Sequence, residues 1–134
     1  MATSDNVVRA GLTPKLRDVS TLVSMLDYEA GPAERQLLTP HEFNRDPTTL
    51  IYDPPIDEFS VLRVHLAQDE VTTHRPIDGP SIVVITNGEV DITWAGAGEI
   101  IATKGDVLFM AAGGEYKWQA RLDTEAFRAF VEVA

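Results

Sequence analysis

SIVVITNGEVDITW, residues 81–94, decides the fold class of this chain. In its second half the apolar residues Val90, Ile92 and Trp94 alternate with polar ones, which is the period of two that a strand with one wet face shows. Asn87-Gly88 lies between the two halves, and both residue types tolerate positive φ, so we expect a tight hairpin turn there. The stretch therefore predicts two strands joined by a turn.

Turn-forming residues divide the sequence around this stretch into short segments of the same character. Glycine lies in each of the breaks at 95–98, 104–106 and 113–114. Close spacing of short strands is typical of an antiparallel sandwich or barrel, so we predict a mainly β fold. The seven predicted strands are FSVLRVHL (59–66), SIVVIT (81–86), EVDITW (89–94), EIIAT (99–103), DVLFMAA (106–112), EYKWQARL (115–122) and AFRAFVEV (126–133).

A single helix is predicted before the strands. Asp18 can accept hydrogen bonds from the free N–H groups of a first helical turn, and Gly31-Pro32 cannot continue a helix. We therefore predict one short helix over residues 19–28. Its apolar stripe has the spacing i, i+3, i+4 and i+7 and consists of Val19, Leu22, Val23 and Leu26.

Residues 32–58 are rich in turn formers and contain Pro40, Pro47 and the pair Pro54-Pro55. Proline fixes φ and has no N–H to donate to a sheet ladder, so it opposes both regular helix and regular sheet. We expect this region to be a linker between two packing units.

Length and charge narrow the class of protein. A chain of 134 residues, of which 44% are hydrophobic, can bury one core. Its 21 acidic against 11 basic residues give a net charge of -10, which repels nucleic-acid backbones and anionic lipid surfaces, so we expect neither nucleic acid nor membrane as a partner. The chain has no cysteine, and its first ten residues lack the pattern of a secretion signal, so we expect a soluble, cytoplasmic protein.

Histidine and carboxylates are the candidate metal ligands, because cysteine is absent. A protein zinc site needs three or four converging ligands. His41 is expected in the linker, His65 in a strand and His74 in a loop, with no HxH or HxxxH spacing, and His65 shares the polar face of its strand with Arg63. We predict no metal site made by this chain alone.

Nucleophilic catalysis has no support in the sequence. There is neither a GxSxG motif nor a phosphate-binding glycine loop, and serine without an adjacent base carries no catalytic signal. Carboxylates are so frequent in this acidic chain that no single pair of them indicates a catalytic site. We expect Asp53, Asp57 and Glu58 to be solvated charges of a loop.

The strand and turn that contain Gly105 and Gly113 resemble the second motif of cupin barrels. In that motif a proline precedes the second glycine and a metal-binding histidine follows it, whereas this chain has Ala111 and Tyr116 at the matching positions. The resemblance implies a cupin-like antiparallel jelly roll or barrel that binds no metal at this place. Taken alone, each glycine is explained equally well by a β-turn.

SDNVVRAGLTPK (4–15) places an arginine directly after two valines near the start of this acidic chain. The segment resembles the arginine-bearing segment of type I mannose-6-phosphate isomerases, which are zinc-dependent aldose–ketose isomerases of the cupin superfamily. The resemblance extends over essentially the whole chain. Further segments, in the same order as in the C-terminal domain of those enzymes, are YDPPIDEFSVLR (52–63), GPSIVVITNGEVDI (79–92), GDVLF (105–109) and FRAFVEV (127–133).

The resemblance implies the interconversion of mannose 6-phosphate and fructose 6-phosphate, small phosphosugars of the route to GDP-mannose. It implies a catalytic role for Arg9 and substrate-binding roles for Asp5 and Lys15. A guanidinium keeps its proton near neutral pH and presents a planar fork of donors to oxyanions, so Arg9 suits the stabilisation of an enediolate better than the role of a base. An Asx turn at Asp5 and a solvated lysine at Lys15 explain those two residues equally well.

The resemblance also implies a missing part. In the family the zinc ligands, which are a glutamine, two histidines and a glutamate, precede the arginine segment, and this sequence has no residues there. We therefore expect residues 1–35 to be the C-terminal remnant of the catalytic domain, whose N-terminal part is the missing partner, and residues 36–134 to form the cupin-like β domain. Zn²⁺ is expected in the intact enzyme and not in this chain, which we expect to be inactive alone because nothing would polarise the sugar carbonyl.

Two alternatives stay open. The chain can be a stand-alone, metal-free cupin-like module that binds a sugar or a protein, or a noncatalytic subunit that docks on a full-length homologue. The fragment hypothesis predicts that residues 1–28 have lost their neighbours, which would leave Val7, Val8, and Leu22 or Leu26 exposed. A stand-alone module would instead bury the stripe of its helix.

Overall fold

The computed structural model describes residues 7–96 and 98–132, and the chain divides into two compact units at the Leu37/Leu38 boundary. The first unit contains the helix α1 (Val19–Met25) and a 3-10 helix, η1 (Ala33–Gln36). The described residues of the second unit form ten strands. None of the helices in the described part of the chain has the length and apolar character that a membrane crossing requires.

Helix α1 begins where the sequence predicts and ends earlier. The Asp18 carboxylate accepts a hydrogen bond from the Thr21 N–H at 3.0 Å and another from the Thr21 hydroxyl at 2.6 Å, so the predicted N-cap is confirmed. The predicted end at residue 28 is wrong, because Leu26 is already extended. The Asp27 carboxylate accepts the Glu29 N–H at 3.1 Å, which offers this backbone an alternative to the helix.

The apolar stripe of α1 is uncovered. Val19, Val23 and Leu26 are about half exposed, and α1 contains no buried residue. Val7 is also exposed, whereas Val8 and Leu22 are half-buried. Val7 and Leu26 are exposed, as the fragment hypothesis predicts, whereas Val8, also predicted to be exposed, is half-buried.

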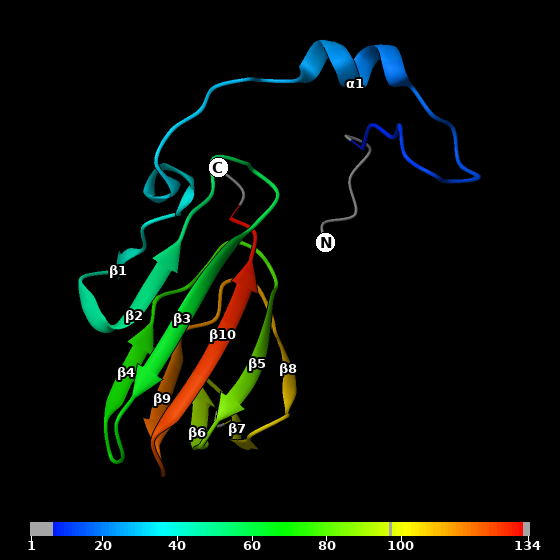
Figure 1. The fold of residues 1–134 in the computed structure, drawn as a ribbon. Helices are drawn as coiled ribbons and strands as arrows, with labels where there is room; N and C mark the ends of the chain where they lie inside the picture. Colours follow the sequence, from blue (N-terminus) through cyan, green and yellow to red (C-terminus); the bar gives the residue numbers. More distant parts are fainter. Residues whose placement is uncertain (1–6, 97, 133–134) are drawn as a thin grey trace. The chain divides into compact units, whose positions relative to one another are not determined.

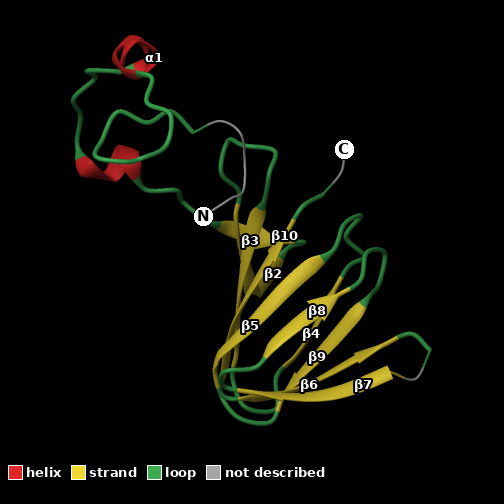
Figure 2. Cartoon of the chain, turned by 90° about the vertical axis from the view of Figure 1, so that its right-hand side faces the viewer, coloured by secondary structure: helices red, strands yellow, loops and turns green. Residues whose placement is uncertain are grey.

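The second unit is a pair of facing antiparallel sheets (Figure 1). The six-stranded sheet has the order β1-β2-β3-β10-β5-β8, and the four-stranded sheet has the order β4-β9-β6-β7. Figure 2 shows the two layers side on. The predicted mainly β, cupin-type fold is confirmed. The strands are β1 (His41–Phe43), β2 (Asp46–Tyr52), β3 (Ser60–Leu66), β4 (Val71–His74), β5 (Ser81–Asn87), β6 (Glu89–Trp94), β7 (Gly98–Thr103), β8 (Val107–Met110), β9 (Tyr116–Ala120) and β10 (Thr124–Phe130).

Alternation along the strands builds the core between the sheets. On β9, Tyr116, Trp118 and Ala120 are buried while Lys117 and Gln119 are exposed, as the sequence predicts. Leu122 lies beyond the end of β9 and is exposed, so its predicted place in the alternation is wrong. The main cluster of buried residues is Val64, Leu66, Val83, Ile85, Val90, Ile92, Ala102, Met110, Tyr116, Trp118, Ala120 and Ala126.

The predicted linker 32–58 is wrong over much of its length. Strands β1 and β2 form a hairpin whose turn residues, Asn44 and Arg45, have φ of 55° and 61°. Pro47 is tolerated near the start of β2, because the register with β3 begins only at Thr49. This Asn-Arg turn lacks the glycine that marks most such hairpins, which is why the sequence pattern did not reveal it.

The turn at Asn87-Gly88 is present, but the predicted hairpin is wrong. Gly88 has a φ of 83°, as a tight turn requires. Strand β5 pairs with β10 and β8, whereas β6 pairs with β7 and β9, so this turn carries the chain from one sheet to the other. Alternation within a strand does not reveal which strand it pairs with.

Candidate functional site

The segment that contains Arg9 forms a loop anchored on α1. The Arg9 carbonyl accepts a hydrogen bond from the Asp18 N–H at 2.8 Å, which closes the loop over residues 9–18. Within it the Thr13 hydroxyl accepts the Lys15 N–H at 3.2 Å. Because Asp18 also caps α1, the arginine loop and the helix start are held by the same residue. The Thr21 hydroxyl bound to that carboxylate lowers the pKa of Asp18.

Arg9 and Lys15 are two cations of this loop. Arg9 is half-buried and Lys15 is exposed, and neither forms an ion pair within residues 7–96 and 98–132. The structure thus places both predicted residues in one loop, between residues 9 and 18. Asp5, the third predicted residue, lies outside the described residues.

Zinc does not fit the described residues of this chain. His41 lies on β1 and His65 on β3, both exposed, while His74 is buried on β4. No group of three histidine or carboxylate side chains that could hold a metal occurs in the described ranges, and the chain has no cysteine. A zinc site would need ligands from elsewhere.

A buried polar cluster joins the two sheets, and sequence reasoning missed it. His74 of β4 was predicted to lie in a loop, which is wrong. Its Nε2 lies 3.2 Å from the Thr49 hydroxyl of β2, and its Nδ1 lies 3.3 Å from a guanidinium nitrogen of Arg128 on β10. Arginine can only donate, so Nδ1 accepts and the proton resides on Nε2, which donates to Thr49. Burial, with the nearby charge of Arg128, lowers the pKa of His74 to about 3.

Arg128 is the charged member of this cluster. It is fully buried, and it donates to the Ser81 hydroxyl at 3.0 Å. Its guanidinium lies 5.4 Å from the ring centre of Tyr116. Burial lowers the pKa of Arg128 to about 10. The alternation of Ala126, Arg128 and Phe130 on β10 is the sequence signal that could have placed Arg128 inside.

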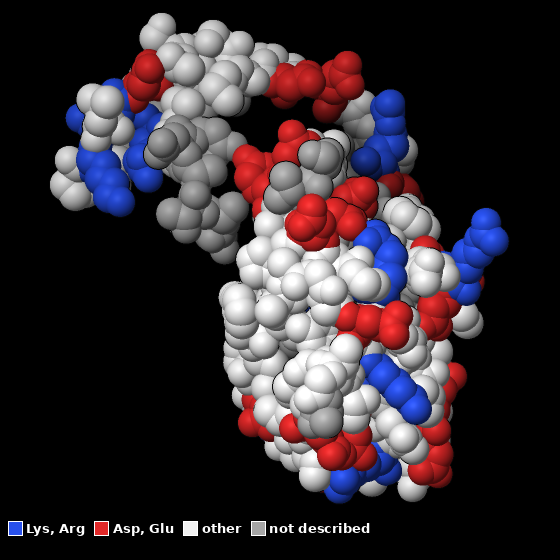
Figure 3. Space-filling model, turned by 180° about the vertical axis from the view of Figure 1, so that it is seen from behind, with Lys and Arg blue, Asp and Glu red and all other residues white. Residues whose placement is uncertain are grey.

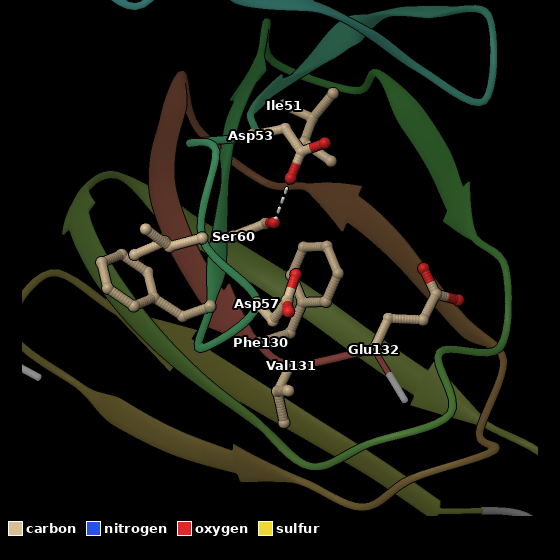
Figure 4. Close-up of a pocket in the computed structure, with 9 residues that line it drawn as sticks. Ile51, Asp53, Asp57, Ser60, Phe130, Val131 and Glu132 are labelled. Carbon is tan, nitrogen blue, oxygen red and sulfur yellow. Dashed lines mark hydrogen bonds between the residues drawn. The ribbon is translucent and has the colours of Figure 1, made fainter. Parts of the chain in front are cut away.

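A cavity of about 830 Å³ opens at one end of the second unit (Figure 4). Three carboxylates line it: Asp53 accepts the Ser60 hydroxyl at 2.6 Å, Glu132 binds both terminal guanidinium nitrogens of Arg75 at 2.7 and 2.9 Å, and Asp57 is exposed. Figure 4 shows these carboxylates around the ring of Phe130. Carboxylates repel a phosphate group, so this cavity is not suited to a phosphosugar.

The comparisons with known proteins agree on one family. A family model described as phosphomannose isomerase type I C-terminal matches residues 49–105. The mannose-6-phosphate isomerase of Cryptococcus neoformans is 58% identical over 133 residues, which are 98% of this chain and 30% of that protein. The chain matches the C-terminal part of the type I phosphomannose isomerases. The resemblance inferred from the sequence is thereby confirmed.

Other relatives show the same partial coverage. The mannose-6-phosphate isomerase of Saccharomyces cerevisiae is 42% identical and matches 98% of this chain and 32% of its own length. The crystal structure of mannose 6-phosphate isomerase from Salmonella typhimurium, bound to fructose 6-phosphate and zinc, matches with a TM-score of 0.76 at 26% identity, over 99% of this chain and 32% of that one. The chain thus spans about a third of the length of these phosphomannose isomerases and corresponds to their C-terminal part.

Proposed function

We propose that this chain supplies the arginine-bearing segment and the C-terminal β domain of a mannose-6-phosphate isomerase, which interconverts mannose 6-phosphate and fructose 6-phosphate. The observation that carries the proposal is the 58% identity to the Cryptococcus neoformans isomerase over 98% of this chain. The absence of cysteine and the acidic charge suit a cytoplasmic enzyme that serves GDP-mannose synthesis.

In this proposal Arg9 stabilises the negative charge that develops on a sugar oxygen during enolisation. A guanidinium near neutral pH cannot take up a proton, but it donates two parallel hydrogen bonds to an oxyanion. Lys15, exposed in the same loop, is suited to bind the phosphate as a point charge, and Asp5 would bind a sugar hydroxyl. The phosphate therefore meets cations of the first unit and not the carboxylate-lined cavity of the second.

The zinc of the Salmonella typhimurium enzyme would polarise the sugar carbonyl, and this chain's described residues do not fit that metal. We propose that its ligands lie in the part of the family enzyme that this chain does not cover, and that the chain alone is inactive. Addition of zinc to the purified chain should leave turnover of mannose 6-phosphate at background. Clear turnover would contradict the fragment proposal.

A full-length chimera tests the role of Arg9. The N-terminal part of the Cryptococcus neoformans isomerase is joined to this chain in place of the matching segment, and turnover is measured with zinc present. Arg9→Gln should lower kcat by about 10²- to 10³-fold, the usual effect of losing one donor to a developing oxyanion. Lys104→Gln, an exposed cation of the second unit, is the control and should leave kcat unchanged. An Arg9→Gln chimera with full kcat would refute the assignment.

A further inference from the structure

Arg128 is a buried cation that has no counter-charge among the described residues. It is fully buried between the sheets, and burial lowers its pKa only to about 10, so the guanidinium keeps its charge near neutral pH. A charge that leaves water without an opposite partner is strongly destabilising, so buried charges in proteins are normally paired. The ion pairs within the described ranges hold other arginines, which are Arg63, Arg75 and Arg121.

The guanidinium of Arg128 also has more N–H donors than its neighbours use. One terminal nitrogen lies 3.3 Å from Nδ1 of His74, and the other donates to the Ser81 hydroxyl at 3.0 Å. Its Nε is buried and has no acceptor in the part of the chain that the structure describes. Because buried donors are almost always satisfied, this nitrogen needs an acceptor from another source.

A second unpaired donor lies in the same cluster. The indole Nε1 of Trp118 is buried and likewise has no acceptor among the described residues. The Trp118 ring lies 5.0 Å from the ring of His74, which is itself the partner of Arg128. Indole and guanidinium groups can only donate, so both unpaired atoms require a ligand that accepts. A water molecule would accept but would leave the charge of Arg128 unbalanced, whereas an anion supplies both properties.

The cluster lies where strands of both sheets meet two loops. His74 is the last residue of β4 and Ser81 is the first of β5, so the loop 75–80 joins them. Tyr116, which pairs with His74, is the first residue of β9 and follows the loop 111–115. Loops open locally at a lower cost in free energy than core strands, so these two give a small ion a route to the interior.

We propose that Arg128 binds a small monovalent anion of the size of chloride between the two sheets, with the Trp118 indole N–H as a second donor. The cross-strand neighbours of Arg128, which are Leu62 and Val83, are fully buried, and this enclosure favours a small ion over a bulky one. The ion would neutralise the buried charge and thereby stabilise the contact between β10 of one sheet and β4 and β9 of the other. This site is independent of the proposed function.

The dependence of stability on halide tests the proposal. The 134-residue chain is unfolded with urea while sodium gluconate, whose anion is bulky, is replaced stepwise by sodium chloride or bromide at constant ionic strength. Screening of surface charges then stays the same. A ligand that binds only the folded chain should raise the folding equilibrium constant, by about tenfold at a concentration of roughly ten times its Kd. A parent chain whose stability ignores the halide would overturn the proposal.

Three variants connect the halide effect to the site. Arg128→Met removes the charge and its donors, so its stability should no longer depend on chloride. Arg63→Met removes a paired, partly exposed cation of the neighbouring strand β3 and is the matched control, which should keep the dependence of the parent. Trp118→Phe removes only the indole donor and should raise the Kd for chloride severalfold. Equal chloride dependence in Arg128→Met and the parent would contradict the site.

Crystals of the parent chain soaked in bromide locate the ion directly. An anomalous scattering peak is expected within hydrogen-bond distance of Arg128 Nε, and its absence would overturn the proposal. This measurement needs no variant, so it decides the question even if Arg128→Met does not fold. A peak without any halide effect in solution would show binding at crystal concentration only and would overturn the proposal as well. Neither readout uses turnover, so failure here leaves the proposed function intact.

Discussion

The two outer faces of the β unit differ although their strands follow the same alternation. The six-stranded sheet presents Ile82, Val84, Val107 and Phe109 outward, in aligned rows, and we call these four residues the outer apolar face. The four-stranded sheet presents a row of Thr73, Lys117, Thr93 and Glu99. Figure 3, seen from behind, shows acidic and basic side chains interspersed along one side and at the lower end of the second unit. The period of the pattern therefore indicates a strand, and the composition of the outward positions determines the polarity of the face.

The largest predicted effect contrasts an aromatic residue inside the sheets with one outside. Trp118 is fully buried, so Trp118→Ala should lower the free energy of unfolding by about 3–5 kcal/mol. Phe109 is also aromatic but is exposed in this chain, so Phe109→Ala should lower the free energy of unfolding by about 0.5 kcal/mol or less. Urea unfolding monitored by circular dichroism measures both. A comparable loss for Phe109→Ala would show that the outer apolar face is already covered in the isolated chain.

The next effect concerns the polar cluster that bridges the sheets. His74 has a pKa of about 3 when folded and an ordinary value of 6.5 when unfolded, so the unfolded state takes up this proton first as the pH falls. The resulting stability is fully present above pH 6.5 and should decline by up to about 1.4 kcal/mol per pH unit as the pH falls toward 3. Arg128 and Asp46 are the charged groups that act on His74.

A pair of histidine variants isolates this titration. His74→Gln keeps a hydrogen-bonding group but cannot gain the proton, so its unfolding free energy should fall less steeply than that of the parent between about pH 6.5 and 4.5. His65→Gln, an exposed site on β3, should keep the parent slope. Unfolding curves at several pH values measure the slopes. Identical slopes for the parent and His74→Gln would show that His74 titrates normally.

The turn between the sheets gives a smaller effect. A methyl group at Gly88 would collide with the Asp123 carbonyl oxygen and would also sit at positive φ, so Gly88→Ala should cost about 2 kcal/mol. Gly96, in the hairpin between β6 and β7, also has a positive φ but open space around it, so Gly96→Ala should cost about 1 kcal/mol. Thermal unfolding of the two variants measures the difference. Equal losses of stability in the two variants would mean that the turn at Gly88 has room for a side chain.

Local patterns predicted seven of the ten strands of the described chain, missed β1, β2 and β4, and did not identify which strands pair. Alternation on β6 and β9 and the cap at Asp18 could be read from the sequence, because both depend on neighbouring residues. The Asn44-Arg45 hairpin and the sheet change at Gly88 depend on strands far away in the chain, which the local pattern does not contain. His74 and Arg128 lie 54 residues apart, so their contact was likewise outside the reach of local spacing.

The candidate site likewise combines residues that the sequence indicated with contacts that only the structure shows. The residues of the arginine loop came from the family resemblance, and the structure adds how Asp18 closes that loop. The outer apolar face was present in the sequence as the run from Ile82 to Ile85. The sequence alone did not show that this run belongs to an apolar surface. The register shows it, because the pairing of β5 with β8 and β10 makes the outward residues neighbours.

The smallest effect on folding free energy concerns the outer apolar face in the isolated chain. Phe109→Lys replaces an exposed side chain, so the free energy of unfolding should change by about 0.5 kcal/mol or less. Self-association should weaken, because a charge interrupts an apolar patch that promotes contact between copies. Thr73→Lys adds the same charge to the outer face of the other sheet and should leave association unchanged. Sedimentation velocity over a range of concentrations measures the self-association of both variants. An equal change in both would show that association depends on net charge and not on the outer apolar face.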